Sequence, residues 1–129
     1  MKGKSAELQQ RKDFALRVLK LIEHLPNTIG GKVLANQLGR SATSVGANYR
    51  AACRARSRAE FASKLGTVAE EADESVYWLE LIRDRDFTPE KRIASLVSEA
   101  DELTAIFTSG CRSASRPQPS KINPQKSGL

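Results

Sequence analysis

Histidine, cysteine and aromatic side chains are scarce in this chain of 129 residues, which has one histidine, two cysteines and 5% aromatic residues. Two cysteines cannot build a disulfide scaffold, and neither their spacing nor that of His24 is typical of a metal site. No apolar run reaches the roughly 18 residues that a membrane span needs, and the N-terminus lacks the apolar segment of a signal peptide. We therefore expect a cytoplasmic protein with reduced thiols, no cofactor and no membrane partner.

The shortage of aromatic residues also limits the core, which must consist mainly of Leu, Ile, Val and Ala. These residues recur at helical spacing in four stretches, and no strand pattern or internal repeat is present. The first stretch covers residues 6–25 and ends before Pro26, because the residue before a proline is pushed out of the α region. The second runs from Asn27 or Thr28 to about Arg56.

The third stretch begins at Ser57, which has capping-box spacing to Glu60. The fourth begins at Thr88-Pro89-Glu90, with the threonine as the cap, and stops at Gly110. Four helices with short joints predict an all-α fold, an antiparallel up-down-up-down four-helix bundle over residues 1–110. Residues 111–129 form a basic tail rich in proline and serine, which we predict to be disordered. The tail could extend an RNA-binding surface or be passive.

Acidic residues are absent from residues 26–56, which carry a net charge of +5, whereas residues 57–87 carry −4. At 100° per residue, the second helix has an apolar seam on one side and a cationic stripe on the other. The seam contains Leu34, Leu38, Val45, Tyr49 and Ala52, and the stripe contains Lys32, Asn36, Arg40, Thr43, Ala47, Arg50 and Arg54. Glycines inside this helix suggest close packing, and a break near Ser41–Ser44 is the alternative.

Two large apolar residues of the third helix, Trp78 and Leu81, fall off its core-facing stripe. Large apolar groups in such positions often mark a subunit contact, so we predict an oligomer interface at these two residues. A partly covered surface tryptophan is the alternative interpretation.

The acidic run from Glu70 to Ser75 is the strongest candidate for chemistry, because clustered carboxylates can bind metal. A di-iron bundle needs Glu-x-x-His pairs on two helices, however, and the chain has only His24, with Leu21 three residues before it. No Ser-His-acid set can be assembled, and Cys53 borders the apolar seam as a packing residue. We therefore expect no catalytic residue, no metal site and no enzymatic activity.

Two blocks of the sequence resemble the four-helix-bundle proteins encoded within 23S rRNA intervening sequences. The first is S-V-G-A-N-Y-R, which ends at Arg50, and the second is E-A-D-E-S-V-Y-W-L, which ends at Leu79. The resemblance covers about residues 10–108 and implies a bundle that assembles into a ring, typically a pentamer. A looser relative is the accessory protein of diversity-generating retroelements, thought to present a basic surface to nucleic acid. Ala51 departs from the family, where a glutamate often follows N-Y-R.

These observations support two interpretations. The first is a non-enzymatic homo-oligomer that associates with RNA through Lys32, Arg40, Arg50 and Arg54, consistent with a net charge of +6 and an isoelectric point near 9.6. The second is a structural or scaffolding oligomer that binds an unknown protein partner and has no nucleic-acid role. In it, the basic helix of one subunit docks on the acidic helix of the next.

Overall fold

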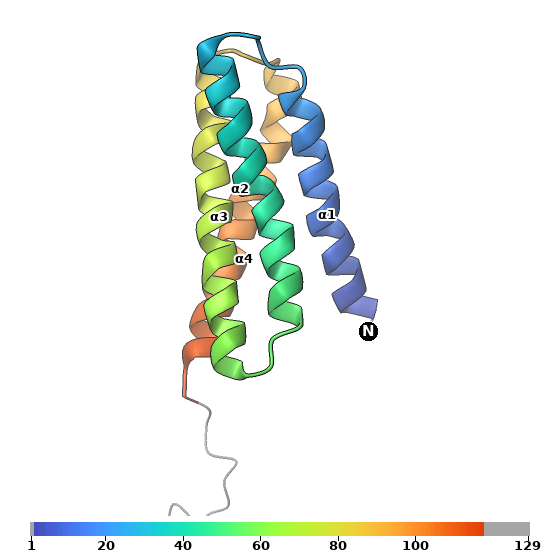
Figure 1. The fold of residues 1–129 in the computed structure, drawn as a ribbon, viewed down its shortest axis with the longest axis vertical. Coiled ribbons are helices and arrows are strands. Elements are labelled where there is room, and N and C mark those ends of the chain that lie inside the picture. The colour runs from blue at the N-terminus through green and yellow to red at the C-terminus, as the bar shows by residue number, and fades with distance from the viewer. Residues whose placement is uncertain (1, 118–129) are drawn as a thin grey trace, which may run out of the picture.

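Four antiparallel helices make up the computed structural model, which describes residues 2–117 (Figure 1). The helices are α1 (Lys2–Ile22), α2 (Ile29–Cys53), α3 (Arg58–Asp84) and α4 (Glu90–Ser115), and no strand occurs in the described part of the chain. The predicted all-α four-helix bundle is therefore confirmed. Most of the predicted disordered tail, residues 118–129, lies outside the described residues.

The apolar seam predicted for α2 is buried along its whole length, and the cationic stripe on the opposite side is exposed. From α1, the core receives Phe14, Val18 and Leu21. The remaining buried side chains from α3 and α4 are almost all Leu, Ile, Val and Ala, as the composition requires. Burial of one apolar face per helix is what holds such a bundle together.

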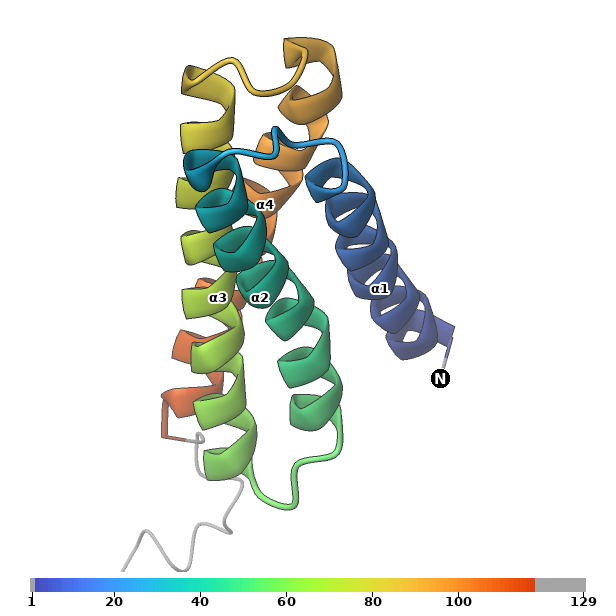
Figure 2. The same cartoon turned by 45° about the horizontal axis from the view of Figure 1, so that its top comes forward.

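The four helices do not contribute equally to the packing. The contact between α3 and α4 is the most extensive, followed by that between α2 and α3, whereas α1 packs mainly on α2. Figure 2 shows α1 inclined to the other helices, with its N-terminal end furthest from the bundle axis. A buried pair, Ser41 of α2 and Ser75 of α3, joins the two central helices through a hydrogen bond of 2.9 Å between their hydroxyls.

No break interrupts α2 near Ser41–Ser44, so its internal glycines do serve packing. A Cβ added at Gly46 would lie 3.5 Å from the Arg11 carbonyl oxygen, which shows how closely the α1 backbone approaches. The Thr28 side chain caps α2 by accepting a hydrogen bond from the Gly31 amide. Of the two predicted cap residues, Asn27 and Thr28, the cap is therefore Thr28.

Several predicted helix ends are corrected by the structure. α1 begins at Lys2 and ends at Ile22, so the loop before Pro26 is longer than expected. Thr88 does not cap α4, because the cap position is Pro89 and no side chain bonds there. The helix also continues past Gly110 to Ser115, since the Arg58 guanidinium donates to the carbonyls of its last turn. The predicted domain boundary at residue 110 therefore lies inside α4.

Candidate nucleic-acid interface

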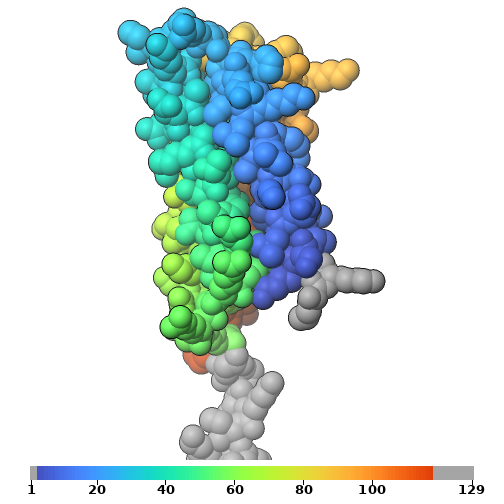
Figure 3. Space-filling model, turned by 45° about the vertical axis from the view of Figure 1, so that its right-hand side comes forward, coloured from blue at the N-terminus to red at the C-terminus, as the bar shows by residue number. Residues whose placement is uncertain are grey.

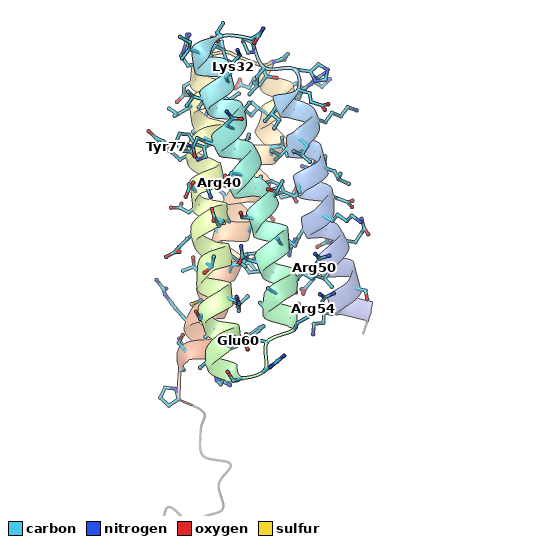
Figure 4. All side chains as sticks on the ribbon, viewed as in Figure 1. Lys32, Arg40, Arg50, Arg54, Glu60 and Tyr77 are labelled. Atoms are coloured by element: carbon cyan, nitrogen blue, oxygen red, sulfur yellow. The ribbon has the colours of Figure 1, made fainter. Side chains whose placement is uncertain are left out.

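The four predicted phosphate-binding residues, Lys32, Arg40, Arg50 and Arg54, all project from the exposed side of α2 (Figure 4). Lys32 stands near the start of the helix and Arg54 directly after its end. At 1.5 Å per residue, these two positions are about 33 Å apart along the axis. The stripe is therefore spread over the bundle, and only Arg50 and Arg54 lie at the same end.

Arg40 is engaged inside the chain by two carboxylates of α3. Its Nη1 lies 3.2 Å from Glu71 Oε1, and its Nη2 forms an ion pair with Glu74. A guanidinium held by two carboxylates carries little net charge toward solvent, since the local charges compensate each other. Arg40 is thus the member of the stripe least available to a phosphate.

A hollow at the junction of α2 and α3 is lined by cations that lie close together, unlike the widely spaced cations of the stripe. This cationic hollow has a volume of about 620 Å³ and is lined by Ala47, Arg50, Ala51, Arg54, Arg56, Glu60 and Lys64. Within residues 2–117, its four cations take part in none of the side-chain ion pairs, which involve Arg17, Arg40 and Arg83. Four cations against one carboxylate make the hollow a strongly positive concave surface.

The turn that builds the hollow is fixed by the predicted capping box. The Ser57 hydroxyl accepts a hydrogen bond of 3.0 Å from the Glu60 amide. The Glu60 carboxylate in turn accepts a hydrogen bond of 2.8 Å from the Arg56 amide. This bond partly compensates the negative charge of Glu60. This tight reversal sets the first turns of α3 beside the last turns of α2.

Arg56 and Lys64 were not among the predicted site residues, although the sequence contained a signal for them. The capping box predicts the chain reversal, and the first two turns of α3 must then lie near the last turn of α2. Lys64 therefore had to approach Arg50 and Arg54. The helical period of α2 alone could not show this, because Lys64 belongs to another element.

The N-terminal end of α1 adds further polar contacts to this end of the bundle. Lys4 Nζ donates a hydrogen bond of 3.1 Å to the Cys53 carbonyl oxygen at the end of α2. The Tyr49 hydroxyl donates to the Glu7 carboxylate. Burial and this hydrogen bond raise the pKa of Tyr49 above its ordinary value, because both favour the neutral phenol. These bonds tie the N-terminal half of α1 to the helix that carries Arg50 and Arg54.

The two predicted interface residues, Trp78 and Leu81, are half-buried and pack against the core. Trp78 Nε1 lies 3.5 Å from Glu74 Oε1, and its ring meets that of Tyr77 edge to face, with 5.0 Å between centroids. Tyr77 is the more exposed neighbour, with 54% of its surface accessible. The interface at Trp78 and Leu81 stays a prediction, and Tyr77 was not among the predicted interface residues.

The other candidate chemistry concerns metals, thiols and membranes. In the described range 2–117, no three His, Cys, Asp or Glu side chains form a group that could hold a metal ion. Cys53 and Cys111 are both half-buried thiols that are not joined to each other. None of the helices in this part of the chain has the length and apolar character that a bilayer crossing requires.

Comparison with known proteins shows similarity to one protein family and to solved structures. A family model described as 23S rRNA-intervening sequence protein matches residues 4–109. A crystal structure of a protein of unknown function from the S23 ribosomal protein family of Bacteroides thetaiotaomicron matches with a TM-score of 0.73 and 34% sequence identity. That match covers 81% of this chain and 96% of the other. No curated protein matches the chain.

Proposed function

The chain belongs to the 23S rRNA-intervening sequence protein family, and we propose that it is a non-enzymatic, ring-forming oligomer that binds RNA through the cationic hollow. The observation that carries RNA binding is the convergence of Arg50, Arg54, Arg56 and Lys64 on one concave surface. Arginine and lysine side chains so arranged can contact successive phosphates of an RNA backbone. The ring, with five copies as the expected number, rests on the family resemblance and on exposed apolar residues such as Leu16 and Tyr77.

The composition of the hollow also indicates how RNA would be recognised. None of its lining residues is aromatic, so the hollow supplies charge without a platform for base stacking. Contacts to phosphates give affinity but carry no sequence information. We therefore expect binding that depends strongly on salt and weakly on RNA sequence.

Fluorescence anisotropy with a labelled RNA hairpin, repeated over a series of salt concentrations, tests this function. Four phosphate contacts per copy give a slope of roughly −3 in a plot of log K against log salt. Arg54→Ala, Arg56→Ala and Lys64→Ala should each weaken binding and reduce the slope by about 1. Arg40→Ala should have a smaller effect, because Glu71 and Glu74 already engage this side chain.

Lys91→Ala is the matched control, since Lys91 is an exposed cation at the opposite end of the bundle, near the start of α4. Binding that is insensitive to salt, or that falls as much for Lys91→Ala as for Arg54→Ala, would contradict a role for the hollow. Retention of full affinity by all three hollow variants would have the same consequence.

A structural oligomer without a nucleic-acid role is the second candidate function. The observation that favours it is the exposure of large apolar side chains on several helices, among them Leu16 at 53% and Tyr77 at 54%. Exposed apolar groups that gather into one patch are typical of surfaces that meet another protein. An oligomer that forms normally and shows no affinity for RNA at low salt would favour this candidate over the first.

A further inference from the structure

We propose that copies of the protein assemble head to tail, with Tyr77 on α3 of one copy docking beside Leu16 on α1 of the next. This inference rests on the proposed function, of which the ring is a part, and it assigns the two surfaces that form each contact. The partner is a second copy of this chain, and the exposure, charge and position of the two surfaces favour it.

The α3 surface is an acidic face centred on Tyr77. At 100° per residue, five carboxylates lie within about 60° of this ring on the helix, Glu70, Asp73, Glu74, Glu80 and Asp84. Tyr77 projects from the outer side of α3, at the left edge of the bundle in Figure 4. Its ring meets that of the half-buried Trp78 edge to face, with 5.0 Å between the ring centroids. A protruding and supported aromatic ring inside a charged rim is the usual anatomy of an interface anchor.

The α1 surface is an apolar face bordered by lysines. Leu16 and Leu19 are 53% and 39% exposed, and Lys12 and Lys20 flank Leu16 one turn before and one turn after it. Two acidic residues also lie on this side of α1, Asp13 one turn before Leu16 and Glu23 two turns after it. Beside these residues, α1 and α2 enclose an open groove of about 420 Å³, which Leu8 and Ala15 line on the α1 side and Lys12 and Arg50 border. Figure 3 shows this side of the molecule, where α1 and α2 meet along a seam.

These two surfaces are complementary and lie on different sides of one chain. Tyr77 supplies a protruding ring with negative neighbours, and the α1 surface supplies an apolar groove with positive neighbours. α1 and α3 occupy opposite corners of the bundle, since α2 packs between them (Figure 1). A contact between two different patches is heterologous, and such contacts generate rings when the rotation between copies closes. Opposite charge on the two patches also disfavours pairing of either patch with itself.

Three single substitutions of equal charge test the assignment by multi-angle light scattering. Leu16→Glu damages the α1 surface, Tyr77→Glu damages the α3 surface, and Ile106→Glu is the control on α4. All three original residues are apolar or aromatic and almost equally exposed, at 53%, 54% and 53%. We expect Leu16→Glu and Tyr77→Glu to be monomers of 14.1 kDa, while Ile106→Glu keeps the wild-type mass. Helical circular dichroism reports whether each variant is folded.

Mixing the two monomeric variants gives the decisive measurement. Each retains one intact surface, so an equimolar mixture should form a dimer through one intact contact and grow no further. A mixture that remains monomeric overturns head-to-tail docking of these surfaces. If both variants keep the wild-type oligomeric mass, the ring stands and the assignment to Leu16 and Tyr77 is overturned. If the wild-type protein is itself a monomer, the proposed ring fails as well.

Discussion

Tyr49 connects three of the four helices at the end of the bundle that carries the cationic hollow. It belongs to α2, its ring lies 5.3 Å from that of Phe107 on α4, and its hydroxyl donates to Glu7 on α1. The Arg11 guanidinium lies above both rings, 5.9 Å from the Tyr49 centroid and 5.4 Å from that of Phe107. Since α1 packs mainly on α2, this cluster is a principal link between α1 and α4.

The raised pKa of Tyr49 predicts a loss of stability at alkaline pH. Burial and the bond to Glu7 favour the protonated phenol in the folded state, so the unfolded chain ionises first, near the ordinary pKa of about 10. The stabilisation is complete below that pH and is lost as the pH rises toward the folded-state pKa.

Tyr49→Phe tests this linkage, because it removes the titrating hydroxyl and keeps the ring. We expect the variant to be less stable than the wild type by about 1 kcal/mol at pH 8. That difference should shrink at pH 11, in urea unfolding followed by circular dichroism. A difference that is constant between the two pH values would show that the ionisation of Tyr49 is not coupled to folding.

At a few positions the backbone of a helix lies very close to another part of the chain, and the clearest case is at the start of α2. A Cβ added to Gly31 would overlap the Pro26 carbonyl oxygen, because the loop folds back over the first turn of the helix. The neighbouring Gly30 has room, since a Cβ there would lie 3.8 Å from the Phe87 ring. Two adjacent glycines of one helix therefore have different roles.

Gly31→Ala and Gly30→Ala should consequently change stability in opposite directions. Gly31→Ala must displace backbone atoms, and we expect it to lower the free energy of unfolding by about 2 kcal/mol or more. Gly30→Ala gains helix propensity at no steric cost, so it should raise that free energy by about 0.5–1 kcal/mol. Thermal denaturation of the two variants and the wild type measures these changes as shifts of the unfolding midpoint. Equal midpoints for both would show that the loop from Pro26 moves aside easily.

At the scale of the whole molecule, a ring would multiply weak contacts with RNA. Each copy offers one cationic hollow, and several hollows on one RNA bind with a higher combined affinity than one hollow does. A monomeric variant should thus keep its affinity for a short RNA that reaches one hollow. Its affinity for a long RNA should fall by about tenfold or more.

Leu16→Glu and Ile106→Glu form the matched pair for this prediction. Both add one negative charge at positions of equal exposure, and only the first is expected to disrupt the ring. Titration of each variant with a short and a long RNA at the same salt concentration separates avidity from charge. A similar loss of affinity by both variants on both RNAs would mean that added charge alone explains the effect, and that the ring contributes nothing to binding.

The sequence by itself determined the local structure of this protein. Apolar residues at a period of 3.6 fixed four helices and the buried seam of α2, and the Ser57–Glu60 capping box fixed the turn after Arg56. These features depend on residues a few positions apart, so a single sequence is enough to find them. The same local character explains the errors at helix ends, since α4 passes Gly110 because Arg58 of another helix stabilises its last turn.

Only the tertiary structure decided which charges act together. Arg40 belongs to the stripe by periodicity, yet Glu71 and Glu74 of α3 engage it. Arg11 lies on the apolar side of α1, three residues before Phe14 and seven before Val18, and it is buried there despite its charge. Its Nε lacks a hydrogen-bond partner among the described residues. The cationic hollow combines Arg50 and Arg54 with Lys64, which lies on another helix. Periodicity reports the face of one helix, whereas the availability of a charge depends on the neighbouring helix, which only packing determines.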